Sequence, residues 1–167
     1  MLTQLNSFLK LCLLAVCLSV TACGFHLRGT GSLDNSDKIV FVDAPYGTFE
    51  QQLKDDLRLS GVQLNNDKLG VDWNIKVSQA RVNREIATLN ERGTVDSYKL
   101  NFIVSYSVFD DQNKLIKAPQ TLVESRQYVY NSVAVIESEF EEQALRESME
   151  KDIAKRIVRQ LSDFNGS

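Results

Sequence analysis

Cysteine and histidine are scarce in this 167-residue chain, and the few that occur lie close to its N-terminus. The three cysteines are Cys12, Cys17 and Cys23, and the single histidine is His26. Residues 27–167 therefore offer no thiol for catalysis, zinc binding or a disulfide, and no imidazole for a Ser-His pair. Gly-x-Ser-x-Gly and glycine-rich phosphate loops are absent as well. We expect neither enzymatic activity nor a metal or other cofactor.

Long apolar runs are also missing, since residues 11–18 form a run of only eight. A helix that spans a bilayer needs about 20. The run follows the single charge of Lys10, which is typical of a secretion signal, here residues 1–22. Residues 20–23, Val-Thr-Ala-Cys, resemble the lipobox of bacterial lipoproteins. This resemblance implies cleavage after Ala22, with diacylglycerol on the Cys23 sulfur and an acyl group on its new amine. A plain signal peptide followed by a chance cysteine is the alternative.

The residue after the lipidated cysteine bears on the destination of such lipoproteins. An Asp there favours retention in the inner membrane of enterobacteria, so Gly24 implies the outer membrane of a Gram-negative cell. Without residues 1–22 the chain keeps 145 residues, enough for one domain with a sizeable core. Its 18 Lys and Arg against 22 Asp and Glu leave a net charge of −4. That charge disfavours a general nucleic-acid or anionic-membrane surface.

The first part of the remaining chain is read as a tether, a strand and a helix. Residues 23–37 are rich in Gly, Ser and Asn, which indicates a flexible lipidated tether before a single domain at 38–167. Residues 38–43 form a short apolar run of the kind found in interior strands. Thr48 and Gln51 are spaced as a capping box, and we expect them to begin a helix that ends near Gly61.

Alternation of apolar and polar residues then predicts three strands. It begins at Val71, is interrupted over residues 81–85, where we expect a bulge, and ends before a turn at 90–93. A return strand at 94–109 has apolar even positions from Tyr98 to Val108, and at 16 residues it exceeds the usual strand length of about 3 to 10. This hairpin is expected to extend past the body of the domain, and a further strand follows at 121–130.

A long amphipathic helix closes the chain. Ser138 and Glu141 are spaced as a second capping box, and the helix is expected to reach about Phe164. Its predicted core stripe consists of Phe140, Ala144, Leu145, Met149, Ile153, Ile157, Leu161 and Phe164. The order β-α-β-β-β-α predicts an α+β fold, with two helices packed on one face of a four-stranded, mostly antiparallel sheet.

These features resemble the LPS-assembly lipoprotein LptE (RlpB) family over essentially the whole chain. The resemblance is carried by Cys23-Gly24-Phe25-His26-Leu27-Arg28-Gly29, by residues 57–62 (Leu-Arg-Leu-Ser-Gly-Val) and by the order of elements. It implies a non-enzymatic outer-membrane lipoprotein that plugs the β-barrel LptD, assists its assembly and binds lipopolysaccharide on its way to the cell surface. No other cofactor than the lipid on Cys23 is implied.

Two groups of residues fit this implied function. The odd positions Ser97, Lys99, Asn101, Ser105 and Ser107 form a polar strand face that suits the polar lumen of a barrel. An ordinary solvated face is the alternative. Lipopolysaccharide carries phosphates, and the residues Arg81, Arg84 and Arg92 near the hairpin turn are our candidates for binding them. Scattered surface charge is the alternative there.

Two other functional classes stay open at this level. A periplasmic envelope lipoprotein could dock on another envelope protein, for example a hydrolase that it inhibits or a different barrel. A small envelope hydrolase would need measurable turnover. Co-purification after mild detergent extraction separates the first of these from the barrel partner.

Overall fold

A computed structural model of the chain describes residues 37–164, which form two helices and one five-stranded sheet. The predicted signal peptide, the lipidated cysteine and nearly all of the tether lie outside these described residues. In chain order the elements are β1 (Ile39–Asp43), α2 (Gly47–Leu59), β2 (Gln63–Leu64), β3 (Trp73–Leu89), β4 (Val95–Phe109), β5 (Leu115–Val129) and α3 (Val135–Ser162).

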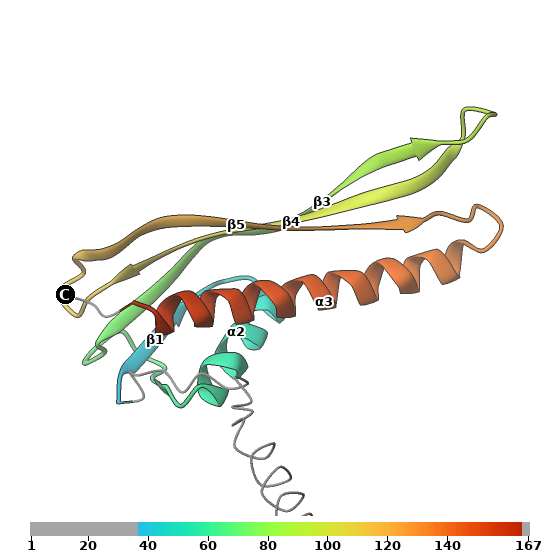
Figure 1. The fold of residues 1–167 in the computed structure, drawn as a ribbon. Coiled ribbons are helices and arrows are strands. Elements are labelled where there is room, and N and C mark those ends of the chain that lie inside the picture. The colour runs from blue at the N-terminus through green and yellow to red at the C-terminus, as the bar shows by residue number, and fades with distance from the viewer. Residues whose placement is uncertain (1–36, 165–167) are drawn as a thin grey trace, which may run out of the picture. The chain divides into compact units, whose positions relative to one another are not determined.

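The sheet has the strand order β2-β1-β3-β4-β5, and Figure 1 shows both helices on one of its faces. Pairing is parallel for β1 with β2 and with β3, and antiparallel for β3 with β4 and β4 with β5. The α+β class with two helices on one face is therefore confirmed, but the sheet is mixed and has five strands instead of the expected four mostly antiparallel ones. The additional strand, β2, has only two residues, too few for a hydrophobic period to show in the sequence.

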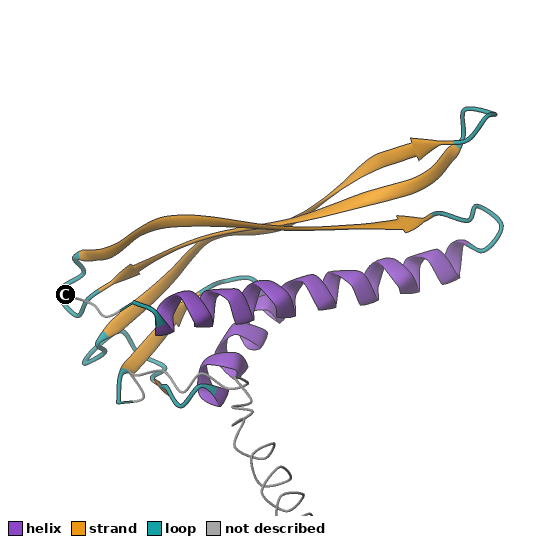
Figure 2. Ribbon diagram, viewed as in Figure 1, coloured by secondary structure: helices purple, strands orange, loops and turns teal. Residues whose placement is uncertain are grey.

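The core lies between the sheet and the helices, and the alternation in β4 is confirmed. Leu100, Phe102, Val104 and Tyr106 are at most 2% exposed, and the ring of Phe102 meets that of Phe49 edge-to-face at 5.4 Å between centroids. Each of these residues points to the helices because successive side chains of a strand alternate between faces. The long hairpin of β3 and β4 is confirmed too, and it continues past the N-terminal end of α3 (Figure 2).

The bulges of the hairpin differ from the prediction. The register of β3 against β4 is continuous from Gln79 to Ile86, and it shifts between Val77 and Gln79 and again after Ile86. The expected bulge at 81–85 is therefore wrong. In that segment β3 places charged residues on both faces, so the apolar–polar alternation stops although the pairing register continues. The prediction took the end of the alternation as a sign of a bulge.

Both predicted capping boxes are wrong. Helix α2 begins at Gly47 after Tyr46, and Thr48 donates its hydroxyl to Glu150 of α3 at 3.2 Å. Helix α3 begins at Val135, three residues before Ser138, whose hydroxyl accepts the Asn131 amide at 3.1 Å. The Thr48 hydroxyl is engaged in a tertiary contact and the Ser138 hydroxyl in a contact with the preceding loop, so neither caps a helix.

The first turns of α3 also differ from the predicted core stripe. Phe140 is 72% exposed and Ala144 is exposed, while the buried residues of these turns are Ser138 and Glu142. From Met149 onward the stripe is confirmed, with Met149, Ile153, Ile157 and Leu161 fully buried. The helix keeps one face against the sheet along its length, but polar side chains occupy that face near its start.

Candidate interaction surface

The face of β3, β4 and β5 that points away from both helices is here called the open face. No helix within residues 37–164 covers it (Figure 1). The register places its side chains in five rows across the three strands. These rows are Gln79–Ser105–Thr121, Arg81–Ile103–Val123, Asn83–Asn101–Ser125, Glu85–Lys99–Gln127 and Thr88–Ser97–Val129.

Neutral hydrogen-bonding groups dominate the open face. The hydroxyls of Ser105 and Thr121 lie 2.9 Å apart, and Ser125 donates to Asn101 at 2.7 Å. Gln127 donates to the Ser97 hydroxyl at 2.9 Å, and Thr88 lies 2.6 Å from the same oxygen. Such side chains still have free donor and acceptor capacity after these bonds are made. These neutral side chains of the open face can therefore bind a polar protein surface through hydrogen bonds.

The three candidate arginines do not form one cluster. Arg81 lies opposite Ile103 on the open face, whereas Arg84 lies opposite Leu100 on the helix side, and Arg92 lies in the turn between β3 and β4. Arg81 and Arg92 are exposed, and in the described part of the chain neither takes part in an ion pair. The three arginines were grouped because they are near one another in the sequence. Nearness in sequence does not show on which face of the strand each side chain lies.

Arg84 is engaged in a partly buried polar network around Glu142 of α3. Its Nη1 donates to Glu142 Oε2 at 3.1 Å, and its guanidinium lies 4.7 Å from the centroid of the Tyr98 ring. Tyr128 of β5 donates its hydroxyl to the same carboxylate oxygen, and Arg146 donates from Nε to Oε1 at 2.9 Å. One carboxylate that is 9% exposed thus joins α3 to β3 and β5.

The network changes the ionisation of its members. Burial opposes the charge on Glu142, but hydrogen bonds from Tyr128, Arg146 and Arg84 outweigh it and hold the pKa of Glu142 below its ordinary value. Burial and the hydrogen bond to Glu142 raise the pKa of Tyr128 to about 12. At neutral pH Glu142 is therefore ionised and Tyr128 is protonated, so Tyr128 remains a donor.

We predict that Glu142→Gln lowers the free energy of unfolding by about 1 to 3 kcal/mol at pH 7, because the charged acceptor of three donors is lost. A carboxylate with a lowered folded pKa stabilises above its ordinary pKa of 4.5, and this stabilisation is lost as the pH falls through the folded pKa. Urea unfolding of both proteins at pH 7 and at pH 3 measures the effect. The gap should shrink at pH 3.

The control for this prediction is Glu141→Gln, which removes an exposed carboxylate from the same helical turn. It should change stability by less than about 0.5 kcal/mol at either pH. An equal loss in both variants, or a gap that widens in acid, would show that the network is not the cause.

The hairpin turn and the loop between β5 and α3 lie at the same end of the fold (Figure 1), and several residues of these segments and their flanks expose apolar side chains. Phe140 and Ile136 of α3 are 72% and 68% exposed, and Val133 of the loop is 94% exposed. Ile86, Leu89 and Val129 at the strand ends are each more than half exposed. In the sequence, the apolar residues 133–136 in a segment that connects two elements could have indicated these exposed apolar side chains.

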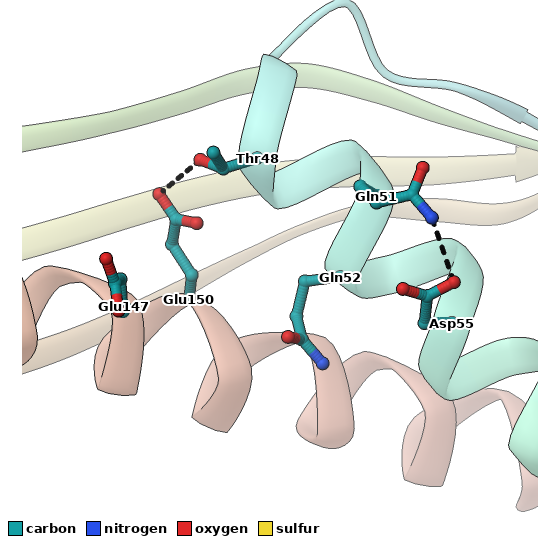
Figure 3. A pocket seen from close by; sticks show the side chains of 6 residues that line it. All are labelled: Thr48, Gln51, Gln52, Asp55, Glu147 and Glu150. Atoms are coloured by element: carbon teal, nitrogen blue, oxygen red, sulfur yellow. Dashed lines mark hydrogen bonds between the residues drawn. The ribbon is translucent and has the colours of Figure 1, made fainter.

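A shallow pocket lies between α2 and α3 (Figure 3). It is lined by Thr48, Gln51, Gln52, Asp55, Glu147 and Glu150. Burial, together with the charge of Glu147, raises the pKa of Glu150 above its ordinary value.

Within residues 37–164 no group of three or more acidic, histidine or cysteine side chains is arranged to hold a metal ion. No helix in that range is long and apolar enough to cross a bilayer.

Comparison with known proteins gives consistent matches. The family model described as LptE, lipopolysaccharide-assembly, matches residues 38–161. The chain is 26% identical over 158 residues to the LPS-assembly lipoprotein LptE of Pectobacterium atrosepticum, a match that covers 92% of this chain and 85% of that protein.

Two solved structures are similar as well. A minor lipoprotein from Acinetobacter baumannii, solved by crystallography, is 30% identical with a TM-score of 0.63, covering 75% of this chain and 91% of that one. Lipoprotein B from Nitrosomonas europaea, solved by NMR, is 25% identical with a TM-score of 0.72, covering 86% and 94%.

Proposed function

Because this chain belongs to the LptE family of non-enzymatic lipopolysaccharide-assembly lipoproteins, we propose that it is a lipid-anchored partner of the outer-membrane β-barrel LptD. In this role it plugs the barrel lumen, assists barrel assembly and takes part in the delivery of lipopolysaccharide to the cell surface. The open face is the observation that carries the proposal. It is a three-stranded surface of mostly neutral hydrogen-bonding side chains with no cover from the described helices.

The chemistry of the open face suits the inside of a barrel. The lumen of a large outer-membrane barrel is polar, because lumen-facing and lipid-facing residues alternate along its strands. Serine, threonine and amide side chains can meet such a wall with hydrogen bonds and little desolvation of charge. The half-buried Ile103 and the exposed Val123, in the second row, add an apolar contact to the surface.

The anchor fits the same role. We propose that the chain enters the periplasm through the signal at residues 1–22 and is held in the outer membrane by the lipids on Cys23, as Gly24 implies. The segment 24–37, fully extended, reaches at most about 50 Å. The domain is then confined to the neighbourhood of the membrane in which its partner barrel sits.

We predict that charge placed on the open face breaks the partnership. Replacing Ser105 and Thr121 with glutamate removes a cross-strand hydrogen bond and introduces two like charges into the surface that meets the barrel wall. Recovery of the barrel with the affinity-tagged chain, after extraction in mild detergent, should fall at least tenfold.

The matched control is Lys155→Glu with Arg159→Glu, which changes exposed charges on α3 instead. This variant should retain the barrel. Equal recovery with both variants would mean that the open face does not contact the partner, and the docking of the chain on another envelope protein would become the better account.

For lipopolysaccharide we propose that Arg81, Arg84 and Arg92 contribute charge-assisted hydrogen bonds to its phosphates. Arg92 lies at the end of the fold that also exposes Phe140 and Ile136, so an amphipathic ligand finds cationic and apolar groups there. Arg84 has to share its guanidinium with Glu142. The exposed Arg81 and Arg92 are therefore expected to make the larger contributions.

Because the arginines are separated, we predict that their effects on lipopolysaccharide affinity are independent. Arg81→Ala and Arg92→Ala should each weaken binding about tenfold, and the double variant about a hundredfold. Binding to purified lipopolysaccharide at two salt concentrations measures this, and salt should weaken it. Lys155→Ala with Arg159→Ala is the control. Equal losses in the control, or unchanged affinity in the double variant, would reject this site.

A further inference from the structure

Strand β3 has a free edge along most of its length. Its neighbour β1 pairs with it only from Trp73 to Lys76, and no other described strand continues along that side (Figure 1). Tyr46 donates its hydroxyl to the Ser78 carbonyl at 2.8 Å, just beyond the end of this pairing. From Gln79 onward, no hydrogen bond between the described residues joins the β3 backbone to a group outside the sheet.

The opposite edge of the sheet, β5, is obstructed. Arg156 of α3 donates to the Val123 carbonyl at 3.4 Å, and Arg126 donates to the Ser125 carbonyl at 3.0 Å. Pro119 has no amide hydrogen to offer to a neighbouring strand. A free edge is a template for pairing with another chain, and proteins usually obstruct it with charge, proline or covering elements. Of the two edges, β3 is therefore the one at which a further strand can add.

The Ser78 carbonyl shows which backbone groups of β3 reach this edge. It accepts its hydrogen bond from Tyr46, which follows β1 and so lies on the side of β3 away from β4. Along an extended strand, residues with groups directed to one neighbour alternate with residues directed to the other side. The register is continuous from Gln79 to Ile86, so this alternation is kept there. Residues with amide and carbonyl groups directed to the free edge are Ala80, Val82 and Arg84.

The side chains at these positions lie on the helix side of the sheet. Ala80 and Val82 are half-buried and pack against the margin of the core, and the guanidinium of Arg84 is already paired with Glu142. A strand beside β3 would extend this margin with apolar side chains, while its other face would extend the polar open face. The edge therefore suits an extended segment in which apolar and polar residues alternate.

We infer that the β3 edge between Gln79 and Ile86 is the site at which the barrel partner adds an extended segment of its own chain. This inference rests on the proposed function and deepens it, because a chain that plugs a lumen is surrounded by its barrel. The strands of the barrel wall are paired on both sides, since a closed barrel has no free edge. The added strand therefore comes from a segment of the partner that lies inside the lumen. It is held by backbone hydrogen bonds, whereas the open face offers side chains.

The test is amide hydrogen exchange, resolved to single residues, on the full lipidated chain alone and in the complex extracted with mild detergent. In the chain alone, the edge-directed amides of Ala80, Val82 and Arg84 should exchange at least about a hundredfold faster than those of Arg81 and Asn83, which are bonded to β4. In the complex, the edge-directed amides should slow by about a hundredfold, because they gain acceptors. Contact through the open face alone provides no acceptor for them.

A proline variant tests the same hydrogen bonds. Val82→Pro removes one edge-directed amide and places the proline ring on the edge, and it keeps the bonds to β4. Recovery of the barrel with the affinity-tagged chain should fall about tenfold. Val82→Thr is the matched control, because it keeps the amide and the branched shape, and it should recover the barrel normally. Slow exchange of the Phe102 amide in Val82→Pro shows that its core is intact, and exchange in the unsubstituted complex decides if it is not.

The outcomes separate this inference from the proposed function. Recovery of the barrel without slowing of the edge-directed amides, or equal recovery with both Val82 variants when both are folded, would overturn the inference and leave the proposed function standing. Slow exchange of these amides in the chain alone would assign the edge to another segment of this chain, and two copies of the chain for each barrel would assign it to the second copy. Either result would overturn the inference. A complex that contains no barrel would overturn both.

Discussion

Replacing Phe102 with alanine is expected to lower the free energy of unfolding by about 3 to 5 kcal/mol. Phe102 is 2% exposed, lies on the helix side of the interior strand β4 and packs edge-to-face against Phe49 of α2. Removing the ring leaves a cavity beneath the helix that neighbouring side chains fill only in part. Urea unfolding of the chain from residue 24 onward measures the loss.

The neighbouring residue provides the control. Asn101 lies on the open face and accepts one hydrogen bond from Ser125, so Asn101→Ala should cost only about 0.5 to 1.5 kcal/mol. Equal losses at the two positions would mean that the faces of β4 are assigned the wrong way round, because a shift by one residue exchanges them.

Cys23→Ser is expected to abolish lipidation completely, because serine has no thiol to receive the diacylglyceryl group. The unlipidated chain should keep its signal peptide and run at the mobility of the precursor. Metabolic labelling with a radioactive fatty acid, followed by electrophoresis, measures both effects. Since one acyl chain alone gives only marginal membrane binding, and several hold firmly, loss of all of them is a large change.

The control for lipidation is Cys17→Ser, which removes a thiol from the predicted signal peptide and should leave labelling intact. Normal acyl labelling of Cys23→Ser would refute the interpretation of residues 20–23 as a lipobox. Loss of labelling in both variants would point to a defect in secretion instead.

The long strands and the core were predictable because they follow short periods. In β4, the apolar even positions from Leu100 to Val108 are all buried, as a period of two requires for a strand with one covered face. The last turns of α3 were predictable for the same reason, since Met149, Ile153 and Ile157 recur at helical spacing. In these elements the spacing of apolar residues along the sequence matches the pattern of buried residues in the structure.

The errors arise where a distant contact decides the structure. Parallel pairing of β1 with both β2 and β3 joins segments far apart in the chain, and no local pattern announces it. Phe140 was assigned to the core because it extends the apolar stripe, yet Ser138 and Glu142 occupy the buried positions of these turns. The charged carboxylate of Glu142 can be buried there because Tyr128, Arg84 and Arg146 donate hydrogen bonds to its oxygens.

The candidate site was predictable to the extent that it follows strand alternation. Of the polar odd positions of β4, Asn101 and Ser105 lie on the open face and are hydrogen-bonded to β5, whereas Ser97 and Ser107 are buried. The arginines were grouped from their nearness in sequence, and the structure places Arg81 and Arg84 on opposite faces. An ion pair such as that between Arg84 and Glu142, 58 residues apart, cannot be read from spacing.

The most direct test of the central claim is the composition of the complex that the intact, lipidated chain forms in its native membrane. The affinity-tagged chain is extracted in mild detergent, purified without cross-linking, and its partners are identified and quantified by mass spectrometry. We expect one large outer-membrane β-barrel, LptD, in a one-to-one ratio with the chain. Recovery of the chain without a barrel, or with a stoichiometric partner of another kind, would contradict the account.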